Sequence, residues 1–179
     1  NFYKEIILND LKDLKLKSIF FIKEKELNKI INSNSAVESY NIFKKYPSTL
    51  YIKIEETNLI AEINKNGKNF YIGTNGKLSE KKFLNKELPF IFGKPNVQQF
   101  LEFKKNIDLS KFSYKEIKNL YFFPSKRWDI ELKDKIIIKL PKENVRKSLD
   151  EIYSFLNNRS INDIKIVDAR IKNQIILND

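Results

Sequence analysis

The residue types that carry most enzyme chemistry are few in this sequence of 179 residues. It has no His and no Cys, so it lacks the commonest general base, the commonest zinc ligand and the thiolate nucleophile. Two carboxylate pairs lie close in sequence, Asp10 with Asp13 and Glu55 with Glu56. Adjacent strand residues point to opposite faces, so Glu55 and Glu56 cannot serve one substrate. None of the four glycines builds a phosphate-binding loop, and the sequence predicts no catalytic, cofactor or metal site.

A basic pair, Lys126 and Arg127, directly precedes Trp128, the one Trp of the chain. An indole beside two cations can stack on a nucleotide base or bind an acidic partner. Trp and Arg are also enriched at protein interfaces. The alternative is a core Trp with two solvated neighbours, and the sequence leaves both interpretations open.

The C-terminal residues alternate in a way that predicts a hairpin. Residues 164–171 and 174–177 form its two strands, with Lys172 and Asn173 at the turn. A terminal strand tends to lie at the edge of its sheet, where unpaired N–H and C=O groups can accept a strand from a partner. The alternative is an edge that is already covered or paired.

The net charge of +11 allows two interpretations. A basic protein attracts nucleic acid, anionic lipid or an acidic protein surface. The basic residues are mostly Lys, however, and they are dispersed among Glu and Asp. That dispersion favours ordinary solvated faces, because a nucleic-acid surface clusters its positive charge.

The elements that would position these residues fall into two segments. The first is predicted as two helices, 2–16 and 23–32, followed by two strands, 37–46 and 50–56. In the second strand, apolar residues alternate with Tyr51, Lys53 and Glu55, which predicts one buried and one wet face. Two helices and two strands make a small α+β module.

The second segment is predicted to be mostly antiparallel sheet with two helices. The turns Asn66-Gly67 and Asn75-Gly76 predict a meander. Residues 88–93 are apolar and bounded by Pro and Gly, and they are interpreted as a connector that fills the core rather than as a binding loop. The predicted helices are 95–107 and 143–156, and the predicted later strands are 117–123, 128–132 and 136–140.

Six blocks in this order resemble a known family. They are Val37-x-x-Tyr40-x-Ile42 continuing to Glu56, Ile60-Ala61, Asn75-Gly76, Leu88-Pro89-x-x-x-Gly93, Trp128-x-Ile130-x-Leu132 and Val167-Asp168-x-Arg170. Together they resemble the extracytoplasmic part of the bacterial cell-division proteins FtsQ and DivIB. The resemblance implies a POTRA-like domain over residues 1–57, without its usual first strand, and a β domain over residues 58–179.

The resemblance also implies a function. The chain would be a non-enzymatic scaffold of the divisome, in the periplasm, attached to the inner membrane by a single span before Asn1. The absence of Met agrees with a segment that precedes Asn1. The POTRA domain would contact other division proteins.

The partner implied by the resemblance is FtsB in complex with FtsL. FtsB would add a strand along the last strand of the β domain, and Lys126, Arg127 and Arg170 would meet its acidic residues. The implied edge residues are Ile171, Lys172, Asn173, Gln174, Ile175, Ile176 and Leu177. The alternatives are a POTRA-containing factor of outer-membrane assembly or secretion and, from another class, a basic nucleic-acid-binding domain.

Overall fold

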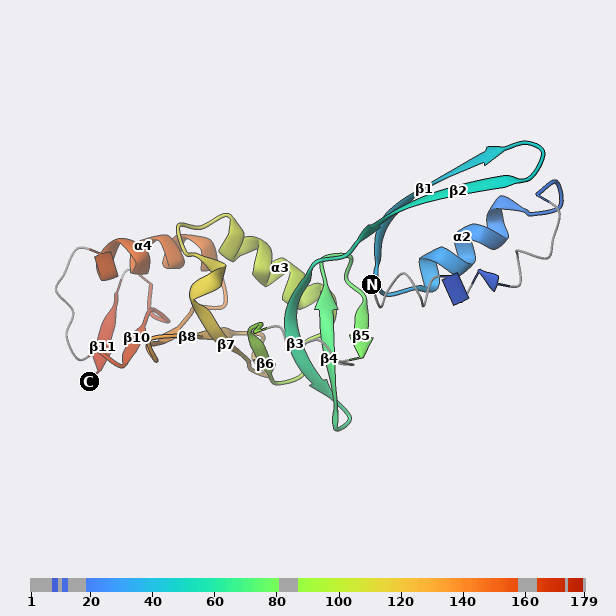
Figure 1. The fold of residues 1–179 in the computed structure, drawn as a ribbon. Helices are drawn as coiled ribbons and strands as arrows, with labels where there is room; N and C mark the ends of the chain where they lie inside the picture. The colour runs from blue at the N-terminus through green and yellow to red at the C-terminus, as the bar shows by residue number, and fades with distance from the viewer. Residues whose placement is uncertain are drawn as a thin grey trace. The chain divides into compact units, whose positions relative to one another are not determined.

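The computed structural model describes residues 8, 9, 11, 12, 19–80, 87–157, 164–172 and 174–178 (Figure 1). Two compact units share the chain: residues 1–59 with 73–79, and residues 60–72 with 80–179. Within the described ranges, no helix is both long and apolar enough to cross a membrane. The predicted helix over residues 2–16 lies almost wholly outside these ranges.

In the described part of the first unit, helix α2 (Glu24–Ser33) packs on a two-stranded antiparallel sheet. It buries Leu27 and Ile31 against the hairpin of β1 (Val37–Lys45) and β2 (Thr49–Glu56). Ile42 and Ile52 are directly opposite each other and pack on the α2 side. The predicted alternation in β2 is confirmed, since Tyr51, Lys53 and Glu55 are exposed and their apolar neighbours are partly buried.

A turn from later in the chain completes the first unit. Residues Gly73–Ser79 belong to it, and the Asn75 side chain forms two of the hydrogen bonds that link them to the start of β1. Asn75 Nδ2 donates to the carbonyl oxygens of Ser35 at 3.0 Å and Val37 at 2.8 Å, and Asn75 Oδ1 accepts from the Lys77 amide at 2.9 Å. The turn therefore caps the start of β1.

The second sheet has nine described strands in the order β11-β10-β9-β8-β7-β6-β3-β4-β5. Its strands are β3 (Leu59–Lys65), β4 (Lys68–Gly73), β5 (Leu78–Glu80), β6 (Phe90–Phe92), β7 (Ile117–Phe122), β8 (Trp128–Leu132), β9 (Ile137–Lys139), β10 (Ile166–Asp168) and β11 (Ile176–Asn178). The predicted meander is present as β3-β4-β5, and Asn66 and Gly67 take the positive φ values of 52° and 80° that an Asn-Gly turn needs. Most of the sheet is antiparallel, but β3–β6, β6–β7 and β9–β10 pair in parallel.

The prediction for residues 88–93 is wrong. Residues 88–93 do not form a connector, because Phe90–Phe92 is a strand between β3 and β7. Parallel partners lie far apart in the sequence, so the short Phe-Ile-Phe segment carries no local signal of its pairing. Helix α3 (Val97–Asp108) follows it and provides the crossover to β7. Asn96 caps this helix, which therefore begins two residues later than predicted.

Helices α3 and α4 (Val145–Asn157) cover one face of the sheet (Figure 1). The central side chains of that face, including Ile130, Ile138 and Val167, are fully buried. Trp128 lies in the same core, with its ring stacked on Phe103 at a centroid distance of 4.6 Å. Of the two interpretations of Trp128, the structure supports that of a core residue.

Candidate protein-interaction site

The site begins at the edge strand β11. Among the described strands β11 has one neighbour, β10, with which it pairs antiparallel. Val167 faces Leu177 and Asp168 faces Ile176 across this pair. Val167 is buried beneath the helices, so Leu177 lies on the covered face and Ile176 on the open one, where it is 44% exposed.

The strand is shorter than the predicted edge. Ile176–Asn178 pairs with β10, whereas Ile171 and Lys172 lie in the turn before it. The Gln174 amide donates to the Ile171 carbonyl at 3.2 Å and closes that turn. Asn173 is outside the described residues. Ile171, Lys172 and Gln174 are all exposed, and Ile175 is partly buried.

Strand directions bring the predicted basic residues to one end of the sheet. Strand β8 begins where β9 and β10 end and where β11 begins, because β9 pairs antiparallel with β8 and parallel with β10. Arg127 precedes β8, and Arg170 and Lys172 follow β10. Residues more than 40 positions apart in the sequence therefore share one end of the sheet beside the edge strand.

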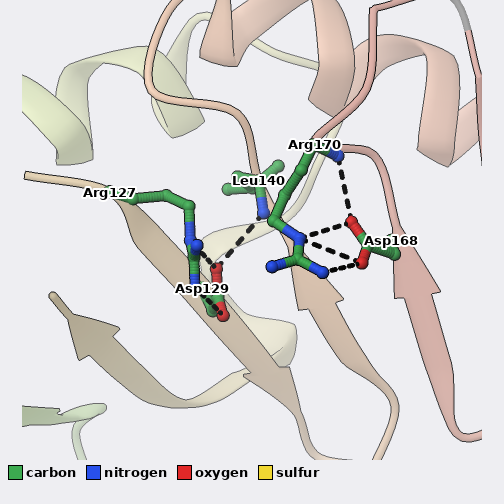
Figure 2. Close-up of polar contacts among 5 residues, drawn as sticks. All are labelled: Arg127, Asp129, Leu140, Asp168 and Arg170. Atoms are coloured by element: carbon green, nitrogen blue, oxygen red, sulfur yellow. Dashed lines mark hydrogen bonds and ion pairs between the residues drawn. The ribbon is translucent and has the colours of Figure 1, made fainter. Parts of the chain in front are cut away.

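Arg170 is held by the last residue of β10. Its Nε donates to the two carboxylate oxygens of Asp168 at 2.8 and 2.9 Å, and its backbone amide donates to Asp168 Oδ1 at 3.1 Å (Figure 2). A carboxylate that accepts the amide two residues later turns the chain out of the strand. The Arg170 hydrogen bonds lower the pKa of Asp168.

Asp129 forms the other half of the polar cluster. Arg127 Nε donates to Asp129 Oδ1 at 3.2 Å, and the Leu140 amide donates to the same oxygen at 3.4 Å (Figure 2). Asp129 is only 4% exposed, and its burial raises its pKa against the opposing effect of Arg127. In Figure 2 the guanidinium of Arg170 lies between the carboxylates of Asp129 and Asp168.

These contacts divide the predicted basic residues into two kinds. Arg127 and Arg170 already bind carboxylates of their own chain. Lys126 and Lys172 are exposed and have no ion pair with any carboxylate that the structure describes. Lys126 also takes a positive φ of 64° at the β7–β8 turn. Within the described residues, the two lysines are thus cations that a partner can bind without displacing an ion pair.

Asp129 and Asp168 are not among the site residues predicted from the sequence, although Asp168 lies in the Val167-Asp168-x-Arg170 block. A signal was present, because each Asp lies two positions from its Arg, and residues two apart on a strand share a face. Their meeting across β9 depends on the parallel pairing of β9 with β10, which the sequence does not indicate. Within the described part of the chain, no group of three or more His, Cys, Asp or Glu is placed to hold a metal.

Two family models match this chain. The model of the C-terminal part of cell-division protein FtsQ/DivIB matches residues 55–170, and the model of the FtsQ-type POTRA domain matches residues 2–57. The chain belongs to the FtsQ/DivIB family. The predicted fold class is confirmed: a small POTRA-type module is followed by a larger, mostly antiparallel domain with flanking helices.

Curated relatives from three bacteria are named cell division protein FtsQ. Those of Rickettsia typhi and Rickettsia bellii are each 30% identical, and each alignment covers 94% of this chain and 64% of the relative. That of Bradyrhizobium diazoefficiens is 24% identical, with 89% of this chain and 48% of the relative covered. The chain therefore spans less than two thirds of the length of these FtsQ proteins.

The chain is also similar to a solved DivIB structure. It is the major extracytoplasmic domain of the trans isomer of DivIB from Geobacillus stearothermophilus, with 14% identity and a TM-score of 0.40. The match covers 60% of this chain and 99% of that chain. The C-terminal family model ends at residue 170, so strand β11 lies beyond the matched residues.

Proposed function

We propose that this FtsQ/DivIB-family chain is a non-enzymatic scaffold of the division machinery that binds a partner by strand addition at β11. The partner strand would come from an FtsB-type protein in complex with an FtsL-type protein. The observation that carries the proposal is the position of β11 at the edge of the sheet, with β10 as its one neighbour among the described strands.

The edge offers both main-chain and side-chain contacts. An edge strand presents N–H and C=O groups to a new strand, and these supply affinity without regard to sequence. Ile176 and Ile171 are exposed apolar side chains at this edge, which can pack against alternate residues of the added strand. The partner strand would thus bury apolar surface as it extends the sheet.

Charge would set the specificity and the rate of association. Lys126 and Lys172 are exposed and unpaired with described carboxylates, at the end of the sheet where β11 begins. Acidic residues of the partner would bind these lysines first. Arg170 would contribute from its exposed side while it holds Asp168, and Arg127 would act mainly by keeping Asp129 in place.

The rest of the proposal concerns the whole protein. Residues 1–57 would be the POTRA-like domain that contacts other division proteins, and residues 58–179 the β domain. A membrane span outside this chain would anchor the protein in the bacterial inner membrane, with both domains in the periplasm. Membership of the FtsQ/DivIB family supports these assignments, which complete the proposed scaffold role.

A pair of proline variants tests the strand addition. Successive amides along an extended segment point to opposite edges. Ile175→Pro, directly before β11, and Ile176→Pro, at its first residue, therefore remove donors on different sides. The probe is the periplasmic segment of FtsB from the same organism, in complex with FtsL, bound to the immobilised 179-residue chain. The variant that removes an outward donor is expected to weaken capture by roughly tenfold, because it loses a ladder hydrogen bond and obstructs the added strand.

Ile176→Thr is the matched control, since it changes the side chain and keeps the amide. It is expected to retain most of the binding. Thermal unfolding of each variant shows whether β11 is still in place. If both proline variants fold and capture the complex as well as the native chain does, strand addition at β11 is wrong.

A further inference from the structure

The end of the first unit where β1 turns into β2 exposes several aromatic rings. Figure 1 shows this turn and the segment that leads into α2 at the same end of the unit. The ring centroids of Phe20 and Tyr46 lie 5.0 Å apart across the two segments. We name this surface the aromatic tip, and its exposed rings are those of Phe20, Phe21, Phe43, Tyr46 and Tyr51.

Phe20 and Phe21 protrude because the residues that flank them are buried. Ile19 and Ile22 lie in the interior, whereas Phe20 is 65% exposed and Phe21 is 77% exposed. Ile22 packs into the same cluster as Leu27, and Lys44 Nζ donates a 2.7 Å hydrogen bond to the Ile22 carbonyl. The buried residues Ile19 and Ile22 therefore hold the two adjacent Phe rings in solvent.

Phe43 and Tyr51 extend the apolar surface along the hairpin. They are directly opposite each other on β1 and β2, on the face that α2 does not cover. Scattered single apolar residues are normal on protein surfaces, but a contiguous patch of large ones marks a binding surface for protein or membrane. The tip contains both a protruding Phe pair and a cross-strand aromatic pair.

The charge around the rings is positive. Residues 39–54 contain Lys44, Lys45 and Lys53 and no Asp or Glu. Lys45 and Lys53 are exposed, as is Lys23, and none of these three pairs with a carboxylate in the described ranges. The acidic residues nearest in sequence are Glu38 and Glu55, which flank this range, and Glu24 and Glu26, which follow Lys23 in the first turn of α2.

We infer that the aromatic tip binds an anionic phospholipid surface. Phe20 and Phe21 would enter the interface between headgroups and acyl chains, where aromatic residues concentrate. Tyr46 and Tyr51 would lie at headgroup level, since each has an apolar ring and a polar hydroxyl. The exposed lysines would attract the lipid phosphates, a charge match that a zwitterionic membrane does not supply. This surface belongs to the first unit and is independent of strand β11.

Vesicle flotation of the whole 179-residue chain tests the inference. The probes are vesicles of phosphatidylcholine alone and of phosphatidylcholine mixed with phosphatidylglycerol. We expect flotation with the mixed vesicles only. Phe20→Ser with Phe21→Ser is expected to reduce the apparent affinity by at least about tenfold, because two apolar rings no longer leave water. Phe92→Ser with Leu109→Ser, which removes two exposed apolar residues of the second unit, is the matched control and should change little.

Charge reversal separates this site from general attraction of a basic protein. Lys45→Glu with Lys53→Glu is expected to weaken binding by roughly tenfold or more. Lys115→Glu with Lys142→Glu produces the same change in net charge at exposed positions of the second unit and should weaken binding far less. If the two double variants lost the same amount of vesicle affinity, the inference would be overturned and net charge alone would explain the binding.

A Phe21→Trp variant reports insertion directly. Its fluorescence, after subtraction of the buried Trp128 signal of the native chain, is expected to shift to the blue on addition of the mixed vesicles. No shift, or unchanged flotation of the Phe20→Ser, Phe21→Ser chain, would contradict insertion. Binding of the tip to an acidic polypeptide such as polyglutamate, without any flotation, would assign the surface to a protein partner instead of a membrane.

Discussion

The guanidinium of Arg170 donates hydrogen bonds to both carboxylate oxygens of Asp168, two positions earlier in the chain. This pairing ends β10 and fixes the start of the turn that leads to the edge strand. Because Asp129 lies on the other side of the same guanidinium, the cluster couples β8, β9 and β10 at the end of the sheet where β11 begins. The proposed partner strand would therefore bind beside a polar cluster in which the carboxylates are already bound by arginines of the same chain.

The first prediction concerns the two aspartates of this cluster. A carbon-13 titration of the side-chain carboxylates is expected to place the pKa of Asp129 above the ordinary value of 3.8 and that of Asp168 below it. Burial raises the pKa of Asp129, and the Arg170 hydrogen bonds lower that of Asp168. Two midpoints in the opposite order would contradict the arrangement in Figure 2.

The same shifts predict how stability depends on pH. Asp168 has a lowered pKa in the folded state, so its pairing with Arg170 stabilises the fold above the ordinary pKa and is lost as pH falls through the lowered value. Arg170→Gln is therefore expected to destabilise the second unit at neutral pH and to have little effect once Asp168 is protonated. Asp129 affects stability in the opposite direction. Its pKa is raised in the folded state, so its protonation as pH falls relieves a cost of burial and stabilises the fold. Urea unfolding at neutral and at acid pH measures both trends.

The second prediction separates lysines that are free to bind a partner from arginines that maintain the fold. Lys126→Glu with Lys172→Glu is expected to leave unfolding unchanged, to weaken capture of the FtsB–FtsL complex and to reduce its salt dependence. Arg127→Glu is expected to destabilise the chain, because it leaves the nearly buried Asp129 beside a like charge. Lys115→Glu is the surface control. Strong destabilisation by the lysine pair would contradict this division.

The sequence predicts the local parts of this fold well. Hairpins depend on neighbouring residues, so Asn66-Gly67 and the alternation in β2 predict their strands correctly. The helices α2, α3 and α4 were also predicted within about one to two residues at most ends, a normal uncertainty for helix boundaries. Strand β6 was missed because its partners β3 and β7 are distant in sequence and its side chains do not alternate.

In the candidate site, too, local features could be predicted from the sequence and pairings between distant strands could not. That the last strand lies at a sheet edge could be predicted from its place in the sequence, and the pairs Arg127 with Asp129 and Asp168 with Arg170 could be found from their spacing. Their convergence could not, since it requires β9 and β10 to pair in parallel. The aromatic tip was equally hidden, because Ile19, Phe20, Phe21 and Ile22 form one apolar run and only packing decides which of them are buried.

The third prediction tests the turn that completes the first unit. Asn75→Ala removes two hydrogen bonds to the carbonyls of Ser35 and Val37 and one from the Lys77 amide, all in partly buried positions. We expect a loss of about 2–3 kcal/mol in the stability of this unit. The two units need not unfold together, so hydrogen exchange of the β1 and β2 amides is the appropriate measurement. Asn58→Ala, at an exposed position of the same unit, should leave their exchange rates near those of the native chain.

The fourth prediction explains the glycine that ends the Leu88-Pro89-x-x-x-Gly93 segment. Gly93 has a φ of 97°, and a Cβ there would lie 2.2 Å from the carbonyl oxygen of Phe122. A methyl group cannot be accommodated against backbone, so Gly93→Ala is expected to destabilise the second unit by more than about 3 kcal/mol. Gly67 is the matched control, since its φ of 80° is also positive but no atom lies within 4 Å of its Cβ position.

Gly67→Ala should therefore cost only about 1 kcal/mol, the strain of a positive φ alone. The difference between the two variants, measured by urea unfolding of the second unit, isolates the contact between Gly93 and Phe122 from backbone strain. Because this contact joins the end of β6 to β7, Gly93→Ala is also expected to speed hydrogen exchange in both strands, whereas Gly67→Ala affects only the β3–β4 turn. Equal losses of stability in the two variants would show that β6 and β7 do not approach as closely as the structure places them.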